Sequence, residues 1–247
     1  MVVRGIIFDV NGTLVDIRTD EGYEEIYRII SNLLSYQGIS LEPKTLKDLY
    51  FQNMKEQRAA SSERHPEFDA IGIFREIIAL HATDFTRGLP PQKLQQLPTV
   101  LAETYRAVSR FRLQVYPGVE DTIAHLYSKY HLAIITDAQT AYAVPELNVV
   151  GLAGYFDPII VSGDFGYRKP HEGLFTAALT AMNMEPSEVL YVGNDMYRDV
   201  YGGQRIGIKT VFFKSNQGTQ EKEGVNADYI IYNFAELLNA IRFFEDQ

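Results

Sequence analysis

Apolar residues are arranged in two different ways along the chain. In the C-terminal half, short continuous apolar runs alternate with amphipathic stretches, which is typical of strands buried on both faces of a parallel sheet and of the helices between them. We predict strands at 6–8, 132–136, 159–162, 189–192 and 209–213, and helices at 120–129, 140–149, 171–182 and 198–206. Residues 228–232 are a candidate edge strand, and 234–244 a closing helix. This alternation predicts an α/β fold, a Rossmann-like parallel sheet with right-handed crossovers.

Between the first strand and the rest, the pattern is purely helical. Apolar residues recur three and four apart from Glu21 to about Arg112, and prolines divide the stretch into four or five helices. We therefore expect a core domain formed by residues 1–16 and 115–247, interrupted by a helical domain over 17–114.

Polar residues follow the apolar runs directly. Asp9 ends the first run, Thr136 the second, and Lys169 follows the third. Asp195 and Asp199 come after the fourth, four residues apart at the start of a predicted helix. The carboxyl ends of parallel strands are where open α/β folds bind ligands, so Asp9 is a candidate nucleophile. Each residue also has a structural interpretation: a turn aspartate, a strand-end threonine, a solvated lysine, and acidic residues that complement a helix dipole.

The order and spacing of these four motifs resemble the haloacid dehalogenase (HAD) superfamily. The resemblance covers residues 4–16 and roughly 115–215. It implies the HAD fold with a helical cap of the C1 type, and catalysis in which Asp9 attacks phosphorus to form an aspartyl-phosphate.

The resemblance also implies roles for the other motif residues. Thr136, Asp137, Lys169 and Gly12 would bind substrate. Asn11, Thr136 and Lys169 would join Asp9 as catalytic residues. A Mg²⁺ ion would be held by Asp9, the backbone carbonyl of Asn11, Asp195 and Asp199. We expect the Asp9 carboxylate to face the Lys169 ammonium across a small anion pocket.

The chain departs from the family pattern at two positions. Family phosphatases carry a second aspartate two residues after the nucleophile, which protonates the leaving group and then activates water; here that residue is Asn11. An amide cannot exchange a proton near neutral pH. The second departure is Asn194, which stands where the family usually has its first acidic metal ligand, so Asp195 is a candidate replacement.

Composition narrows the possible partners. The net charge is −9, and residues 17–113 hold 13 basic and 13 acidic side chains, so the predicted core carries the whole excess. Such acidity argues against nucleic acid as a partner, and it indicates that a phosphate substrate needs a cation. No apolar run is long enough for a membrane span, no export signal is visible, and cysteine is absent. We expect a cytoplasmic protein; the sequence does not indicate its oligomeric state.

The leading hypothesis is a Mg²⁺-dependent HAD hydrolase of small phosphate monoesters, slowed by Asn11. Two alternatives stay open. One is a HAD enzyme that cleaves a C–halogen or C–P bond, and the other is a catalytically impaired protein that binds a phospho-ligand.

Overall fold

A computed structural model describes residues 1–247, which divide into two compact units. The core unit comprises Met1–Ile17 and Leu113–Gln247, and the helical unit comprises Arg18–Arg112. The chain passes between them in β2 (Val15–Thr19) and β3 (Arg110–Val115), which form a two-stranded sheet.

A six-stranded parallel sheet forms the centre of the core unit, in the order β5-β4-β1-β6-β7-β8. Its strands are β1 (Gly5–Phe8), β4 (His131–Thr136), β5 (Ile159–Val161), β6 (Val189–Gly193), β7 (Lys209–Phe213) and β8 (Tyr229–Ile231). All six predicted strands are confirmed, and the α/β class with them.

Both faces of this sheet are buried, which explains the continuous apolar runs. Because side chains alternate along a strand, Ile6 and Phe8 of β1 join the core on one face and Ile7 joins the core on the other. Tyr191 of β6 lies on the same face as Ile7. That alternation brings a phenol next to the predicted site.

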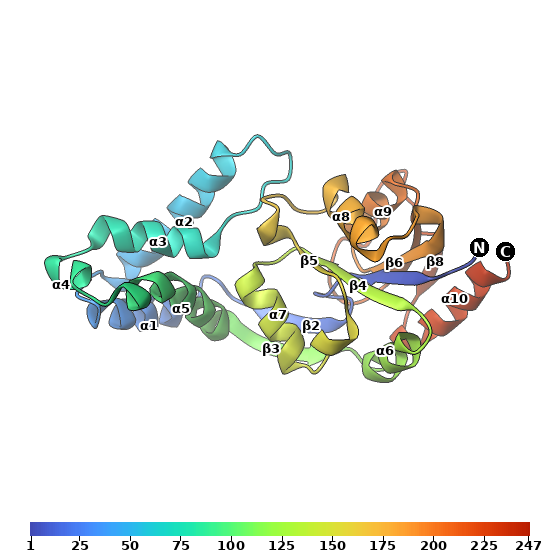
Figure 1. Cartoon of the computed structure of the whole chain (residues 1–247), viewed down its shortest axis with the longest axis horizontal. Helices are drawn as coiled ribbons and strands as arrows, with labels where there is room; N and C mark the ends of the chain where they lie inside the picture. The colour runs from blue at the N-terminus through green and yellow to red at the C-terminus, as the bar shows by residue number, and fades with distance from the viewer. The chain divides into compact units, whose positions relative to one another are not determined.

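Helices cover the sheet on both sides (Figure 1). The face of Ile6 packs against α6 (Val119–Tyr127), α7 (Thr140–Val149) and α10 (Leu237–Glu245), and the face of Ile7 packs against α8 (Glu172–Met182). The two termini lie side by side, and the N-terminal ammonium donates to the Phe244 carbonyl at 2.7 Å. Short 3₁₀ turns lie at Ala153–Tyr155, Ser162–Asp164, Pro186–Glu188 and Phe234–Glu236.

Two helices near the predicted site differ from their predicted form. The helix predicted at 198–206 begins as a π-helical turn, Met196–Tyr201, and continues as α9 (Gly202–Arg205). Helix α8 begins at Glu172 rather than at 171, because the ring of His171 accepts a hydrogen bond from the Gly173 amide and caps it.

The helical unit contains five helices, within the predicted four or five. They are α1 (Glu24–Ser35), α2 (Pro43–Ala60), α3 (Ala70–His81), α4 (Asp84–Arg87) and α5 (Pro91–Ser109). Aromatic rings fill its centre: Tyr50 stacks on Tyr105 at 4.4 Å, and Phe74 packs on both. Burial raises the pKa of Tyr27, which packs edge-on against Tyr105, to about 12.

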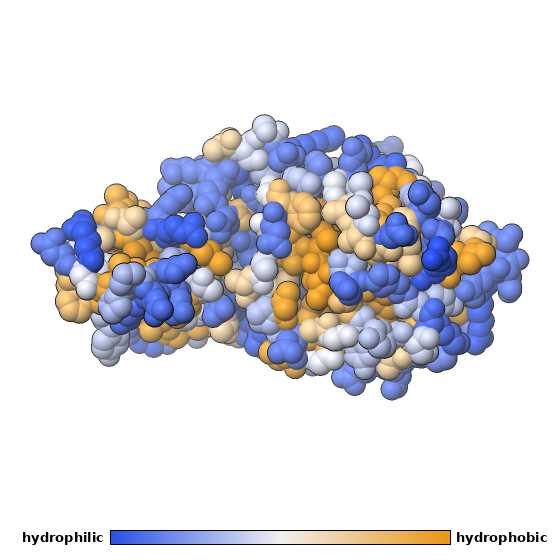
Figure 2. Space-filling model, viewed as in Figure 1, coloured by the Kyte–Doolittle hydropathy of each residue, from blue (hydrophilic) through white to orange (hydrophobic).

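None of the helices is long and apolar enough to cross a lipid bilayer. Hydrophilic residues dominate the face shown in Figure 2, with an apolar area over the region of α7. Val144 and Val149 of that helix are exposed.

Candidate active site

Asp9 directly follows β1 at the carboxyl edge of the sheet, between β4 and β6. Its amide donates to the Val192 carbonyl at 3.0 Å, so the residue continues the ladder. The next turn closes on Val10, whose carbonyl accepts from the amides of Thr13, Leu14 and Val15. The rigid sheet and this tight turn fix the position of the Asp9 carboxylate.

Both oxygens of that carboxylate are held. The Lys169 ammonium donates to Oδ1 at 2.7 Å, and the Thr13 hydroxyl lies 3.0 Å from Oδ2. Asp9 is only 5% exposed. The ammonium therefore contacts the carboxylate directly rather than across a pocket, and the carboxylate is restricted to one orientation.

Lys169 is surrounded by acceptors. Besides Asp9, its Nζ contacts Asp199 Oδ1 at 2.6 Å, the Tyr191 hydroxyl at 3.1 Å and the Ile135 carbonyl at 3.3 Å. Burial opposes its charge, but the carboxylates of Asp199 and Asp9 raise the pKa of Lys169 well above its ordinary value. The lysine is thus a permanent cation inside the protein.

Asp199 links Lys169 to the end of β6. Its Oδ2 accepts from the amides of Asn194 and Asp195 at 3.1 and 3.0 Å, and its Oδ1 accepts from Lys169 and from the Tyr191 hydroxyl. Any side chain at Gly193 would collide with Asp199. Burial raises the pKa of Asp199, and Lys169 offsets only part of that effect.

Both carboxylate oxygens of Asp195 accept hydrogen bonds, mostly from the π-helical turn that follows it. Oδ1 accepts from the amides of Tyr197 and Arg198, and Oδ2 accepts from the Thr219 amide at 2.9 Å and from Arg198 Nε at 3.0 Å. Burial would raise the pKa of Asp195, but these amide and guanidinium contacts lower it. The side chain caps a helix as well as lying at the site.

The two asparagines lie close to the nucleophile. Asn194 Oδ1 is 3.1 Å from the Thr13 hydroxyl, whose single hydrogen can serve either Asp9 or Asn194 at one time. Gly12 has φ +91°, and a side chain there would collide with the Asn194 amide, so only glycine fits this turn. Asn11 Oδ1 is buried with no hydrogen-bond partner.

The carboxyl end of β4 contributes Thr136 and Asp137. Thr136 is 1% exposed. Asp137 Oδ1 accepts from the Lys169 amide at 2.9 Å, whereas Oδ2 has no hydrogen-bond partner and lies 3.7 Å from Arg198 NH1. Burial raises the pKa of Asp137 more than Lys169 lowers it.

The structure thus joins Asp9, Lys169 and Asp199 by direct contacts, and it links Asp195 to Asp137 through Arg198. Sequence reasoning missed three members of the site: Thr13, Tyr191 and Arg198. Thr13 and Arg198 lie inside the recognised motifs, so position alone could have pointed to them. Only the strand alternation of β6 could have pointed to Tyr191.

The side chains near Asp9 that could bind a metal, those of Asp195 and Asp199, offer oxygen atoms, which suits a hard cation such as Mg²⁺. The orphaned Asn11 Oδ1 adds one more unused oxygen at this place. No three His, Cys, Asp or Glu side chains are grouped closely enough to hold a metal by themselves. Any metal site here therefore needs backbone, amide, water or substrate oxygens as well.

Known proteins align with nearly the whole chain. The glyceraldehyde 3-phosphate phosphatase of Pyrococcus furiosus is 27% identical over 97% of this chain and 93% of its own. The phosphoglycolate phosphatase of Yersinia pseudotuberculosis is 26% identical over the same shares, 97% and 93%.

Among solved structures, a 2-haloacid dehalogenase from Pseudomonas syringae superposes with a TM-score of 0.71 at 20% identity, over 98% of this chain and all of that one. The Bacillus subtilis HAD-hydrolase YfnB, described as bound to magnesium, superposes with a TM-score of 0.56 at 21% identity, covering 98% of this chain and 100% of its own. At these identities the structural likeness shows the fold alone.

The sequence model of the haloacid dehalogenase-like hydrolase family matches residues 6–213, from the first core strand to the end of β7. The match includes Asp9, Thr136, Lys169 and Asp199, and the resemblance inferred from their spacing is confirmed. The chain belongs to the haloacid dehalogenase-like hydrolase family.

Proposed function

We propose that this protein hydrolyses small phosphate monoesters through an aspartyl-phosphate on Asp9. The observation that carries the proposal is the Asp9 carboxylate itself, fixed at the carboxyl end of the central strand by Lys169 and Thr13. Relatives named as phosphatases align with nearly the whole chain, which supports phosphorus as the electrophile.

The reaction divides into two displacements. A carboxylate oxygen of Asp9 forms a bond to phosphorus while the ester P–O bond breaks, and the electron pair leaves with the alkoxide or phenoxide oxygen. Water then attacks the aspartyl-phosphate, releasing inorganic phosphate and restoring the carboxylate. Thr136 and the turn at Gly12 are proposed to hold the oxygens of the transferred group.

Asn11 sets the expected speed. Its amide cannot give a proton to the leaving oxygen or take one from water. General acid–base catalysis is worth about 10²–10⁴-fold, so turnover is expected to be slower by that order. Esters whose leaving group needs no proton, such as aryl phosphates, should be the better substrates.

The charges at the site support a divalent cation. The site contains four carboxylates but only two cationic side chains paired with them, Lys169 and Arg198. The carboxylates are those of Asp9, Asp137, Asp195 and Asp199. A phosphate dianion would add to that excess. We propose that Mg²⁺ is held by the Asp9 side chain, the Asn11 carbonyl and the pair Asp195 and Asp199, and that each of the last two gives up a protein contact to bind it. When bound, it would neutralise charge on the transferred phosphoryl group.

Turnover of p-nitrophenyl phosphate with Mg²⁺, or with EDTA, tests the proposal. Asp9→Asn should abolish turnover, and Asn11→Asp should raise it by about 10²–10⁴-fold because a group that can take a proton from the attacking water is restored. Asp48→Asn and Asn148→Asp make the same chemical changes at exposed positions and should leave turnover unchanged. If neither Asp9→Asn nor Asn11→Asp alters the rate, the proposal is wrong.

Asn11 also favours a second candidate, a protein that binds a phospho-ligand without hydrolysing it. Phosphate binding in the absence of turnover by the wild type would identify it. Halide release in EDTA would instead indicate the C–halogen reaction. Location in the cytoplasm and the role of the helical unit as a substrate-selecting cap stay predictions.

A further inference from the structure

Lys169 has no hydrogen left for a substrate. An ammonium carries three hydrogens, and four protein acceptors lie within 3.3 Å of this one. The residue is also only 3% exposed. It could reach a substrate oxygen only by giving up a contact to Asp9, Asp199, Tyr191 or Ile135, so its charge serves chiefly to position Asp9.

Arg198 is a second cation at the same edge, and its two terminal nitrogens are free. Its backbone amide and its Nε both donate to the Asp195 carboxylate, at 2.8 and 3.0 Å, which anchors the residue at two points. The two terminal nitrogens make no hydrogen bond in the structure, and the side chain is 42% exposed. Four N–H bonds are therefore available at a fixed place.

The guanidinium also lies within the field of the nucleophile. Burial opposes its charge, but Asp195, Asp199 and Asp9 together raise the pKa of Arg198 above its ordinary value. The nearest other carboxylate, Asp137, lies 3.7 Å from NH1, beyond hydrogen-bond distance, and its Oδ2 is buried without a partner. Asp137 thus attracts the guanidinium without using its hydrogens.

We propose that Arg198 binds the anionic oxygens of the phosphoryl group, while Lys169 holds the nucleophile. The planar edge of a guanidinium offers two parallel donors that match two phosphate oxygens, which a lysine cannot do. This inference rests on the proposed function and assigns its substrate contact.

The test separates binding from turnover. Arg198→Gln should raise KM for p-nitrophenyl phosphate and Ki for inorganic phosphate by about 10–100-fold, with a smaller change in kcat. Arg198→Lys, which keeps the charge but not the paired donors, should recover only part of the loss. The matched control is Arg205→Gln on α9, because Arg205 pairs with Glu172 at 3.4 Å and should leave both constants unchanged.

A direct readout does not need turnover. Inorganic phosphate, with Mg²⁺ present, should raise the melting temperature of the wild type and of Arg205→Gln, and should raise that of Arg198→Gln much less. A fall in melting temperature without any change in KM or Ki would show a purely structural role and overturn the inference. So would a wild type that binds no phosphate.

The two proposals fail in different ways. If Asp9→Asn abolishes hydrolysis but Arg198→Gln keeps the wild-type KM and Ki, only the role of Arg198 is wrong. If Asp9→Asn keeps full activity, the proposed function is wrong.

Discussion

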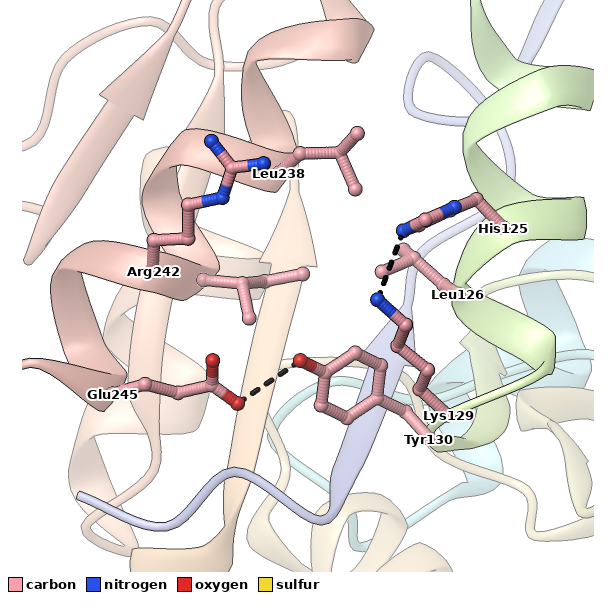
Figure 3. A pocket seen from close by; sticks show the side chains of 8 residues that line it. His125, Leu126, Lys129, Tyr130, Leu238, Arg242 and Glu245 are labelled. Atoms are coloured by element: carbon pink, nitrogen blue, oxygen red, sulfur yellow. Dashed lines mark hydrogen bonds between the residues drawn. The ribbon is translucent and has the colours of Figure 1, made fainter.

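Two clusters of charged side chains lie at opposite edges of the same sheet. At the carboxyl edge, Lys169 is enclosed by Asp9, Asp199 and Tyr191. At the amino edge, just before β4, a cavity of about 100 Å³ between α6 and α10 is lined by residues that include His125, Lys129, Tyr130, Arg242 and Glu245 (Figure 3). Each cluster contains a lysine and a tyrosine whose hydroxyl contacts a carboxylate.

The clusters differ in how their charges are satisfied. Lys129 is exposed and its Nζ lies 3.3 Å from His125 Nε2, with no carboxylate paired to it. Arg242 also lines the cavity without an ionic partner. Water can solvate these groups, so pairing is unnecessary. In the cluster at the carboxyl edge, water is excluded from Lys169. An unpaired buried charge there would lower the stability of the fold by several kcal/mol, so Lys169 is paired with carboxylates. We therefore expect the same substitution to lower the free energy of unfolding more at the carboxyl edge than at the amino edge.

The largest difference is expected between the two lysines. Lys169→Met leaves the carboxylates of Asp9 and Asp199 buried and unpaired, and should lower the free energy of unfolding by about 3–5 kcal/mol. Lys129→Met should change it by less than about 0.5 kcal/mol, as surface substitutions usually do. Urea denaturation of both variants measures the contrast; equal values would show that Lys169 is not an essential counter-ion.

A smaller effect is expected for Asp195, compared with Asp121 in the first turn of α6. In Asp195→Asn, the Thr219 amide and Arg198 Nε lose the carboxylate oxygen to which they donate. The free energy of unfolding should fall by about 2 kcal/mol. Asp121→Asn, at an exposed position, should cost at most about 0.5 kcal/mol.

The Asp195 variant should also change the pH dependence of stability. Because the folded protein lowers the pKa of Asp195, its ionised form contributes stability above the unfolded pKa of about 3.9, and this contribution is lost as pH falls through the folded pKa. The difference in the free energy of unfolding between wild type and Asp195→Asn should therefore become smaller below about pH 4. If this difference did not change with pH, the negative charge of Asp195 would not be what stabilises the fold.

The smallest contrast concerns the two tyrosines. Tyr191→Phe removes a hydroxyl that contacts Lys169 and Asp199, and should cost about 1 kcal/mol, the usual net value of a buried hydrogen bond. Tyr130→Phe loses a bond to Glu245 at the surface and should cost less than about 0.5 kcal/mol. Melting temperatures of the two variants, compared at one pH, would reveal the order; a reversed order would break the comparison.

The sheet could be predicted because each of its central strands is marked by a run of apolar residues within the strand itself. Strands β1, β4 and β6 are buried on both faces, so each appears as an uninterrupted apolar run. Strands β2 and β3 were missed because their residues vary between buried and exposed without such a run. The π-helical turn was missed because no pattern distinguishes it from an α-helix of the same composition.

The site could be predicted only as a set of motifs. Spacing placed Asp9, Thr136, Lys169 and Asp199 at one edge, but it could not show that Lys169 contacts Asp9 directly or that the Asp195 oxygens cap a helix. Those facts depend on which way side chains turn and on partners, such as Tyr191 and Thr219, that carry no motif. Asn11 and Asn194 were visible as departures, yet only the fold shows Asn194 beside Thr13.

The central position of β1 has a consequence for how the protein reaches its native state. Gly5 pairs with His131 on one side and with Val189 on the other, so the strand that precedes the nucleophile has no neighbour in the sheet until β4 has been synthesised. Pairings so distant in sequence slow folding, because the intervening chain loses its freedom before the contact is gained. The helical unit, whose contacts lie within residues 18–112, is free of that delay. The apolar strand that precedes Asp9 is therefore exposed to aggregation until its partner strands follow.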